Sequence, residues 1–113
     1  MPLKKTTETT RNFVEAVAKH QGWKLNSDRE FLDSIITGLT ATYNNYGYFR
    51  CPCRDSWGTR EKDADIVCPC EYCRPDMQEY GHCYCGLFLT ADFAAGGKPP
   101  SSIPERRPEN RFP

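Results

Sequence analysis

All seven cysteines of this 113-residue chain lie within one window, residues 51–85. Six of them form three Cys-X-Cys pairs and the seventh stands alone: Cys51/Cys53, Cys68/Cys70, Cys83/Cys85 and Cys73. An odd number of cysteines cannot be fully paired as disulfides within one chain. Outside secreted disulfide scaffolds, clustered thiols are more often metal ligands or redox groups than structural bridges. The window therefore predicts a metal or redox centre.

The spacing of the thiols leaves three kinds of centre open. Structural zinc sites usually take two thiolates from a Cys-x2–4-Cys turn, at about 2.3 Å per sulfur, and only Cys70 and Cys73 have that spacing. An iron–sulfur cluster needs four thiolates, which leaves three sulfurs for a redox pair and one spare. The spacing favours the cluster over a zinc-stabilised binding module and over disulfide exchange without metal. An iron–sulfur electron carrier without disulfide activity is a further alternative.

The rest of the composition narrows the class of protein. Fifteen basic and fifteen acidic residues balance, and no basic patch with interleaved aromatic residues is present, which argues against nucleic-acid binding. Lys4 and Lys5 are not followed by the apolar run of a secretory signal, and no stretch approaches the roughly 20 apolar residues of a membrane span. We therefore expect a cytoplasmic chain that does not cross a membrane.

Apolar periodicity predicts two helices ahead of the cysteines. The first covers about residues 10–21 and ends at Gly22. The second begins at a capping box formed by Ser27 and Glu30 and continues to about residue 43. We expect both apolar stripes to pack in the core.

Beyond these helices, frequent Pro and Gly leave room only for short elements. Brief helices are expected at three places: residues 60–67, 75–80 and 90–93. The segment 96–113 is rich in Pro, Gly and Ser and is expected to be an extended or disordered tail. The prediction is a mainly α fold: a catalytic domain over residues 1–95, made of short helices wrapped around the cysteine centre, followed by the tail.

Three ordered motifs resemble the signature of the ferredoxin–thioredoxin reductase catalytic chain, which has two Cys-Pro-Cys pairs, a Cys-His-Cys pair and a Leu-Phe-Leu-Thr run. The motifs in this sequence are Cys51-Pro52-Cys53-Arg54, Cys68-Pro69-Cys70 and Cys83-Tyr84-Cys85-Gly86-Leu87-Phe88-Leu89-Thr90. Asn45-Tyr46-Gly47-Tyr48 also resembles the segment that precedes the first pair in that family. The similarity covers roughly residues 10–93 and leaves the tail unmatched.

The resemblance implies an assignment for six cysteines. The expected [4Fe–4S] cluster ligands are Cys51, Cys68, Cys70 and Cys83. The expected redox-active disulfide joins Cys53 and Cys85, each two residues after a ligand. The resemblance further implies that the cluster passes single electrons to this disulfide, and that the Cys53 thiolate attacks the disulfide of a target protein.

The resemblance also implies partners. A ferredoxin, or a rubredoxin-like protein, is the expected electron donor, and thioredoxin or a thioredoxin-like protein is the expected acceptor. In part of the family the catalytic chain pairs with a small β-barrel subunit, and the sequence does not decide whether this chain does so.

Two departures from the family pattern carry their own hypotheses. Tyr84 stands where the family has the histidine of Cys-His-Cys, and His82 just before this pair is predicted to take over proton transfer; the alternative is a surface or capping histidine. Cys73 has no counterpart, and is either a helix-start or surface thiol without a task, or a substitute ligand or regulatory thiol. Arg54 follows Cys53 directly, where it either lowers the pKa of that thiol or faces solvent.

Overall fold

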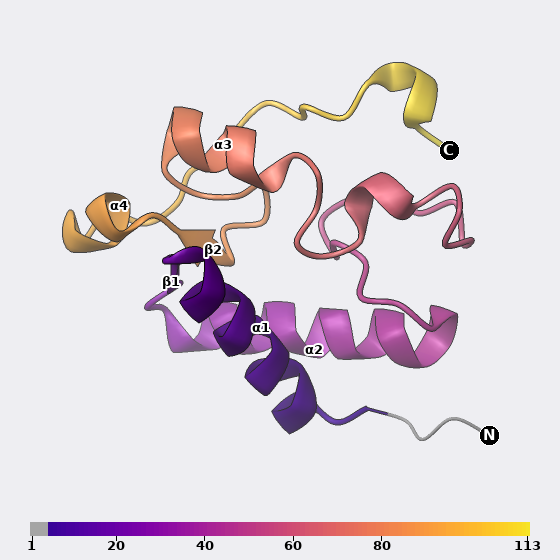
Figure 1. Ribbon diagram of the computed structural model, residues 1–113, viewed down its shortest axis with the longest axis horizontal. Helices are drawn as coiled ribbons and strands as arrows, with labels where there is room; N and C mark the ends of the chain where they lie inside the picture. Colours follow the sequence, from indigo (N-terminus) through magenta and orange to yellow (C-terminus); the bar gives the residue numbers. More distant parts are fainter. Residues whose placement is uncertain (1–4) are drawn as a thin grey trace.

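Two helices form the base on which the cysteine segment lies in the computed structural model, which describes residues 5–113 (Figure 1). Helix α1 (Thr7–Gln21) crosses α2 (Arg29–Tyr46), and both predicted helices are thereby confirmed in type and order. Their facing sides are apolar and buried, as at Val14 of α1 and Leu39 of α2. The apolar stripes read from the sequence are therefore core positions.

Helix α1 begins three residues earlier than predicted. The Thr6 side chain accepts a hydrogen bond from the Thr9 backbone N–H at 3.2 Å, and the Thr9 side chain accepts one from the Thr6 N–H at 3.0 Å. This capping box satisfies N–H groups that have no partner within the helix. The predicted end is confirmed, because Gly22 adopts the left-handed conformation that glycine accepts at low cost (φ 75°).

The predicted start of α2 is wrong by one residue. The cap is Asp28 rather than Ser27, because the Asp28 carboxylate accepts a hydrogen bond from the Phe31 backbone N–H at 3.2 Å. Glu30 thus lies within the first turn and is not the second half of a Ser27 capping box. The helix also continues beyond the predicted residue 43, to a left-handed Gly47.

A short antiparallel pair of strands joins the segment after α1 to the segment after the last cysteine pair. Strand β1 (Lys24–Leu25) follows α1, and β2 (Phe88–Leu89) lies in the apolar run that follows the last cysteine pair. A two-residue strand is too short to produce a recognisable alternating pattern, so this pairing was not predicted. It holds the third cysteine pair against the helical base.

The segment between the first two cysteine pairs is less helical than predicted. Only a single 3₁₀ turn, η1 (Ala64–Ile66), forms where a helix was expected over residues 60–67. The physical reason is that Asp63 and Asp65 turn inward to buried partners, and a 3₁₀ turn lets both carboxylates do so.

The later helices agree better with the sequence. Helix α3 (Cys73–Tyr80) begins two residues before the predicted start at Pro75, which occupies the first turn, where a missing N–H leaves no hydrogen bond unmade. Helix α4 (Ala91–Ala95) is capped as predicted, with the Thr90 hydroxyl accepting from the Phe93 N–H at 3.1 Å.

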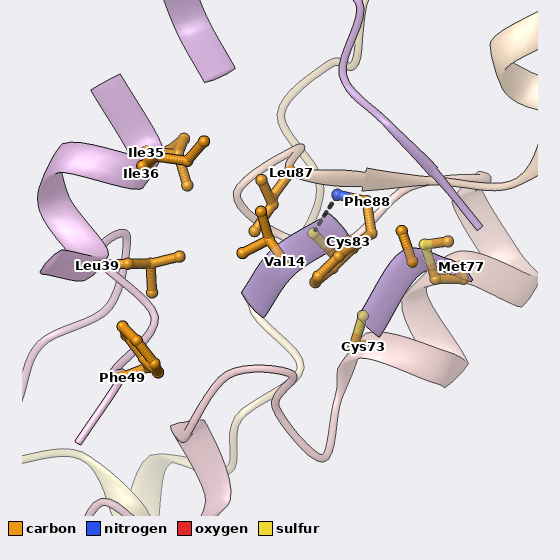
Figure 2. Packing of buried hydrophobic residues seen from close by; sticks show 11 residues of the cluster. Val14, Ile35, Ile36, Leu39, Phe49, Cys73, Met77, Cys83, Leu87 and Phe88 are labelled. Atoms are coloured by element: carbon orange, nitrogen blue, oxygen red, sulfur yellow. Dashed lines mark hydrogen bonds between the residues drawn. The ribbon is translucent and has the colours of Figure 1, made fainter. Parts of the chain in front are cut away.

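The core extends from the helical base to the cysteines. Figure 2 shows the thiols of Cys73 and Cys83 beside the buried side chains of Met77 and Phe88, and not in a separate polar layer. The apolar residues around the cysteines come from α1, α2, α3 and β2. The cysteine centre is therefore one end of the hydrophobic core.

The C-terminal segment, residues 96–113, has little regular structure apart from the 3₁₀ turn η2 (Glu109–Arg111), yet it lies against the cysteine segment. Arg107 is only 3% exposed and pairs with Asp65, while Glu105 pairs with Arg54. Within residues 5–113, no helix has both the length and the apolar character that crossing a bilayer requires.

Candidate functional site

Six of the seven cysteines line one cavity. They are Cys51, Cys68, Cys70, Cys73, Cys83 and Cys85. The remaining wall is largely apolar, with Leu39 from α2 and Leu87 and Phe88 from the C-terminal side. The structure thus gathers all four predicted cluster ligands in one water-poor space.

Backbone hydrogen bonds bring the first two pairs together. The Cys51 N–H donates to the Ile66 carbonyl at 2.9 Å, and the Cys68 N–H donates to the Phe49 carbonyl at 2.7 Å. These bonds flank an antiparallel bridge between Arg50 and Val67. Two Cys-Pro-Cys segments that lie far apart in the sequence are in this way held side by side.

The third pair is held by a tight turn that returns to β2. The Cys83 N–H donates to the Phe88 carbonyl at 3.1 Å, and the Phe88 N–H donates to the Cys83 sulfur at 3.4 Å, the contact drawn in Figure 2. The Gly86 N–H closes the turn on the Cys83 carbonyl at 2.9 Å. Cys85 therefore lies beside Cys83, with their sulfurs 4.0 Å apart.

Cys53 differs from the other thiols because it is exposed. Hydrogen bonding from Cys51, and to a smaller extent from Cys85, lowers the pKa of Cys53 to about 4. Donating to Cys53 raises the pKa of Cys51 to about 11, and donating to Cys51 and Cys53 raises the pKa of Cys85. Cys53 and Cys85, the predicted redox pair, thus affect each other's pKa, and Cys53 is the exposed member with the lowered pKa.

A second pocket, with a volume of about 250 Å³, opens beside Cys53. The C-terminal segment forms much of its wall through Glu105, Arg107 and Phe112, and Tyr84 belongs to both pockets. This contribution could not be predicted, because a Pro-rich composition carries no information about distant partners.

Arg54 is buried, so the expectation that it faces solvent is wrong. Its Nη1 donates to the sulfur of Cys70 at 3.2 Å and to that of Cys51 at 3.7 Å. Its positive charge contributes only weakly to the low pKa of Cys53, behind the hydrogen bonds from Cys51 and Cys85. The closest thiols of Arg54 are two of the predicted cluster ligands.

His82 is buried, which rules out the surface alternative, but it does not line either cavity that contains the predicted redox thiols. Its Nδ1 lies 2.8 Å from the Cys83 carbonyl oxygen, and its ring packs edge-on against Phe93. Tyr84 faces the thiols in its place and stacks on Arg54.

Cys73 is the first residue of α3, as the helix-start prediction had it, but it is buried and not on the surface. It hydrogen-bonds to the sulfur of Cys83, which raises the pKa of Cys73 and lowers that of Cys83. Cys73 therefore contacts a predicted ligand directly.

The donor set fits an iron–sulfur cluster. Burial raises the pKa of Cys68, and raises that of Cys70 to about 11, so thiolates at these positions need a bound cation to offset the cost of burial. Within residues 5–113, no three His, Cys, Asp or Glu side chains have the geometry to hold a single metal ion. The four predicted ligands line one cavity, which is consistent with a cluster held by four cysteine thiolates.

The model of the family described as ferredoxin thioredoxin reductase catalytic beta chain matches residues 2–106. The chain is 33% identical over 99 residues to the chloroplastic ferredoxin–thioredoxin reductase catalytic chain of Arabidopsis thaliana, covering 86% of this chain and 65% of that protein. It is 36% identical over 90 residues to the corresponding catalytic chain of Pyropia yezoensis, covering 75% and 72%.

A similar protein from Spinacia oleracea, the chloroplastic ferredoxin–thioredoxin reductase catalytic chain, is 31% identical over 99 residues, covering 86% of this chain and 64% of that one. The chain thus spans between 64% and 72% of the length of these three relatives.

Proposed function

Because the chain belongs to the ferredoxin–thioredoxin reductase catalytic beta chain family, we propose that it is an oxidoreductase that uses electrons from ferredoxin to reduce the disulfide of thioredoxin or a thioredoxin-like protein. The observation that carries the proposal is the arrangement of the thiols. Six line one cavity, and the exposed seventh, Cys53, lies close enough to Cys51 and Cys85 for them to lower its pKa. A structural zinc module has no need for an exposed, ionised thiol beside its ligands.

Four of the buried thiols would hold the cofactor: Cys51, Cys68, Cys70 and Cys83. When bound there, a [4Fe–4S] cluster supplies one-electron transfer between the donor and the Cys53/Cys85 pair. The apolar residues Leu39, Leu87 and Phe88 exclude water from this space, and the Phe88 N–H donates to the Cys83 sulfur.

Cys53 and Cys85 divide the disulfide chemistry between them. Cys53 is the nucleophile, because a pKa of about 4 keeps it as a thiolate at neutral pH. Its sulfur attacks the acceptor disulfide, whose S–S bond breaks as a mixed disulfide forms. Cys85 then attacks the Cys53 sulfur, which releases the acceptor as a dithiol and leaves a Cys53–Cys85 disulfide. Two electrons from the donor, taken up one at a time, and two protons restore the dithiol.

The partners follow from the same proposal. A ferredoxin or a rubredoxin-like protein donates the electrons, and thioredoxin or a thioredoxin-like protein accepts them. The pocket of about 250 Å³ beside Cys53 offers space for the acceptor residues that flank its disulfide. A small β-barrel second subunit, as in part of the family, belongs to this proposal as a binding partner to be tested by co-purification.

His82 remains a predicted proton carrier for this pair. His82 directly precedes Cys83, a predicted ligand, in the sequence. Its ring packs against Phe93 and contacts the Cys83 carbonyl oxygen. Replacing His82 with Gln keeps a hydrogen-bonding side chain but removes the imidazole ring. Turnover that is unchanged from pH 6 to pH 8 would reject this role.

The first experiment is a visible absorption spectrum of anaerobically purified protein, with iron, sulfide and zinc assayed on the same sample. The proposal expects a brown protein with about four irons and four sulfides per chain. A colourless protein with one zinc would instead support the zinc-stabilised module.

The second experiment separates a reductase from an electron carrier. With chemically reduced ferredoxin, the wild type should reduce a thioredoxin disulfide, and Cys53→Ser should not. Cys85→Ser should accumulate a mixed disulfide between Cys53 and the acceptor, visible on a non-reducing gel. A cluster-containing wild type that leaves thioredoxin oxidised would support the carrier alternative.

A further inference from the structure

Arg54 directs each edge of its guanidinium group to a different partner. Its Nε donates to both carboxylate oxygens of Glu105, at 3.0 and 2.8 Å, and its Nη2 lies 3.9 Å from the Asp76 carboxylate. The third edge, Nη1, donates to the sulfurs of Cys70 and Cys51 at 3.2 and 3.7 Å. Because Glu105 binds the Nε edge, the orientation toward the sulfurs is fixed from outside the thiol cavity.

Packing holds the guanidinium group in this orientation. The Arg54 side chain is only 1% exposed and lies between two aromatic rings, 4.3 Å from the centroid of Tyr84 and 5.3 Å from that of Tyr72. The Arg54 carbonyl also accepts a hydrogen bond from Arg50 Nη1 at 2.6 Å, which anchors the backbone. A planar guanidinium suits this position, since it can stack on aromatic rings and donate in several directions at once.

The charges around Arg54 already balance without the thiols. Arg54 and Arg106 are positive, Glu105 and Asp76 are negative, and Arg106 Nε donates to Asp76 at 2.8 Å. The thiols are therefore not needed to neutralise a buried cation. Glu105 lies at the Nε edge of the guanidinium, away from the sulfurs. The sulfurs therefore face the Nη1 hydrogen-bond donor and the positive charge of Arg54.

Hydrogen bonds to cluster sulfurs and nearby charge are among the factors that set the reduction potential of iron–sulfur sites. Resting on the proposed function, we propose that Arg54 is a positioning residue that raises the reduction potential of the cluster by donating to the ligand sulfurs of Cys51 and Cys70. A cluster held by these sulfurs would become more negative on reduction, and a hydrogen-bond donor with positive charge would stabilise that reduced form.

The test compares midpoint potentials in anaerobic redox titrations followed by visible absorbance, on protein with equal iron and sulfide content. Arg54→Met removes the charge and the donors but keeps apolar volume between the tyrosine rings, and its potential should be more negative than that of the wild type. Arg54→Lys keeps the charge without the planar fork, and its potential should lie between the two. Arg106→Met is the matched control, because Arg106 contacts the same Asp76 but makes no hydrogen bond to a sulfur.

The outcomes distinguish this inference from the proposed function. A wild type without an iron–sulfur cluster refutes the proposed function. A cluster-containing wild type whose potential is matched by Arg54→Met refutes the inference alone, and so does an equal shift in Arg106→Met, because it would reduce the effect to general charge. If Arg54→Met does not retain iron, Arg54→Lys replaces it as the test variant. An Arg54→Lys protein with the wild-type spectrum and an unchanged midpoint potential then refutes the inference.

Discussion

Arg107 is the residue whose removal should cost the most stability outside the thiol cavity. Its Nε and Nη2 donate to the two oxygens of Asp65 at 2.9 and 3.3 Å, and its other N–H groups donate to the carbonyls of Asp55 and Lys62 at 3.1 and 3.4 Å. Both side chains of the ion pair are almost fully buried. Arg107→Met would leave the Asp65 carboxylate buried without its cation.

Breaking such a buried pair costs about 3–5 kcal/mol. Asp65 keeps a hydrogen bond from the Tyr72 hydroxyl at 2.7 Å and a distant ion pair with Arg111 at 3.8 Å, so we take the lower end, about 3 kcal/mol. At about 4 °C per kcal/mol for a chain of this size, the melting temperature should fall by about 12 °C.

The assay is thermal unfolding followed by far-ultraviolet circular dichroism, on anaerobic samples matched for iron content. Arg111→Met is the control: Arg111 approaches the same carboxylate, but its side chain is 52% exposed, and a pair of this kind contributes less than about 1 kcal/mol. Equal melting temperatures for the two variants would refute the reasoning, because burial would then not decide the value of the ion pair.

Three further predictions concern other parts of the chain. Burial alone would raise the pKa of Asp65, but hydrogen bonds from Tyr72 and Arg107 outweigh it and lower that pKa. The contribution of Asp65 to stability should therefore be complete above the unfolded pKa of about 3.9 and be lost as the pH falls below it, less steeply in Arg107→Met. Urea midpoints measured against pH test this, and parallel profiles for the two proteins would contradict it. Gly81→Ala should lower the free energy of unfolding by roughly 2–4 kcal/mol, because φ is +85° and the added Cβ would lie 2.7 Å from the ring of the α4 phenylalanine; an unchanged urea midpoint would show that both the ring and the backbone relax. Cys73→Ala should keep wild-type iron and sulfide, since four other thiols suffice for a cluster, whereas loss of iron would make Cys73 a ligand.

Local signals in the sequence predicted the parts of the fold that depend on neighbouring residues. The left-handed stop at Gly22 and the Thr90 cap were predicted correctly because each depends on chain within a few residues. The start of α2 was misplaced because Ser27 and Asp28 are both good caps, and only the observed backbone decides between them. The helix expected over residues 60–67 was lost to long-range carboxylate contacts, which local propensity does not contain.

The candidate site likewise has parts that local sequence motifs predicted and parts that depend on long-range contacts. Motif resemblance singled out the six paired cysteines, and five of these line one cavity with Cys53 beside it. The position of Arg54 could not be predicted, because its partner Glu105 lies 51 residues away along the chain. The composition of the C-terminal segment predicted little regular structure but not its contact with the site.

The contact between Glu105 and Arg54 also has a consequence for the order of events during synthesis. Glu105 is translated 20 residues after Cys85, the last of the thiols, so every cysteine leaves the ribosome before the carboxylate that holds Arg54 over them. At about 5–20 residues per second, this delay lasts about 1–4 s. During that interval Arg54 is without its carboxylate partner, so its orientation toward the sulfurs is set only after the last thiol has been synthesised.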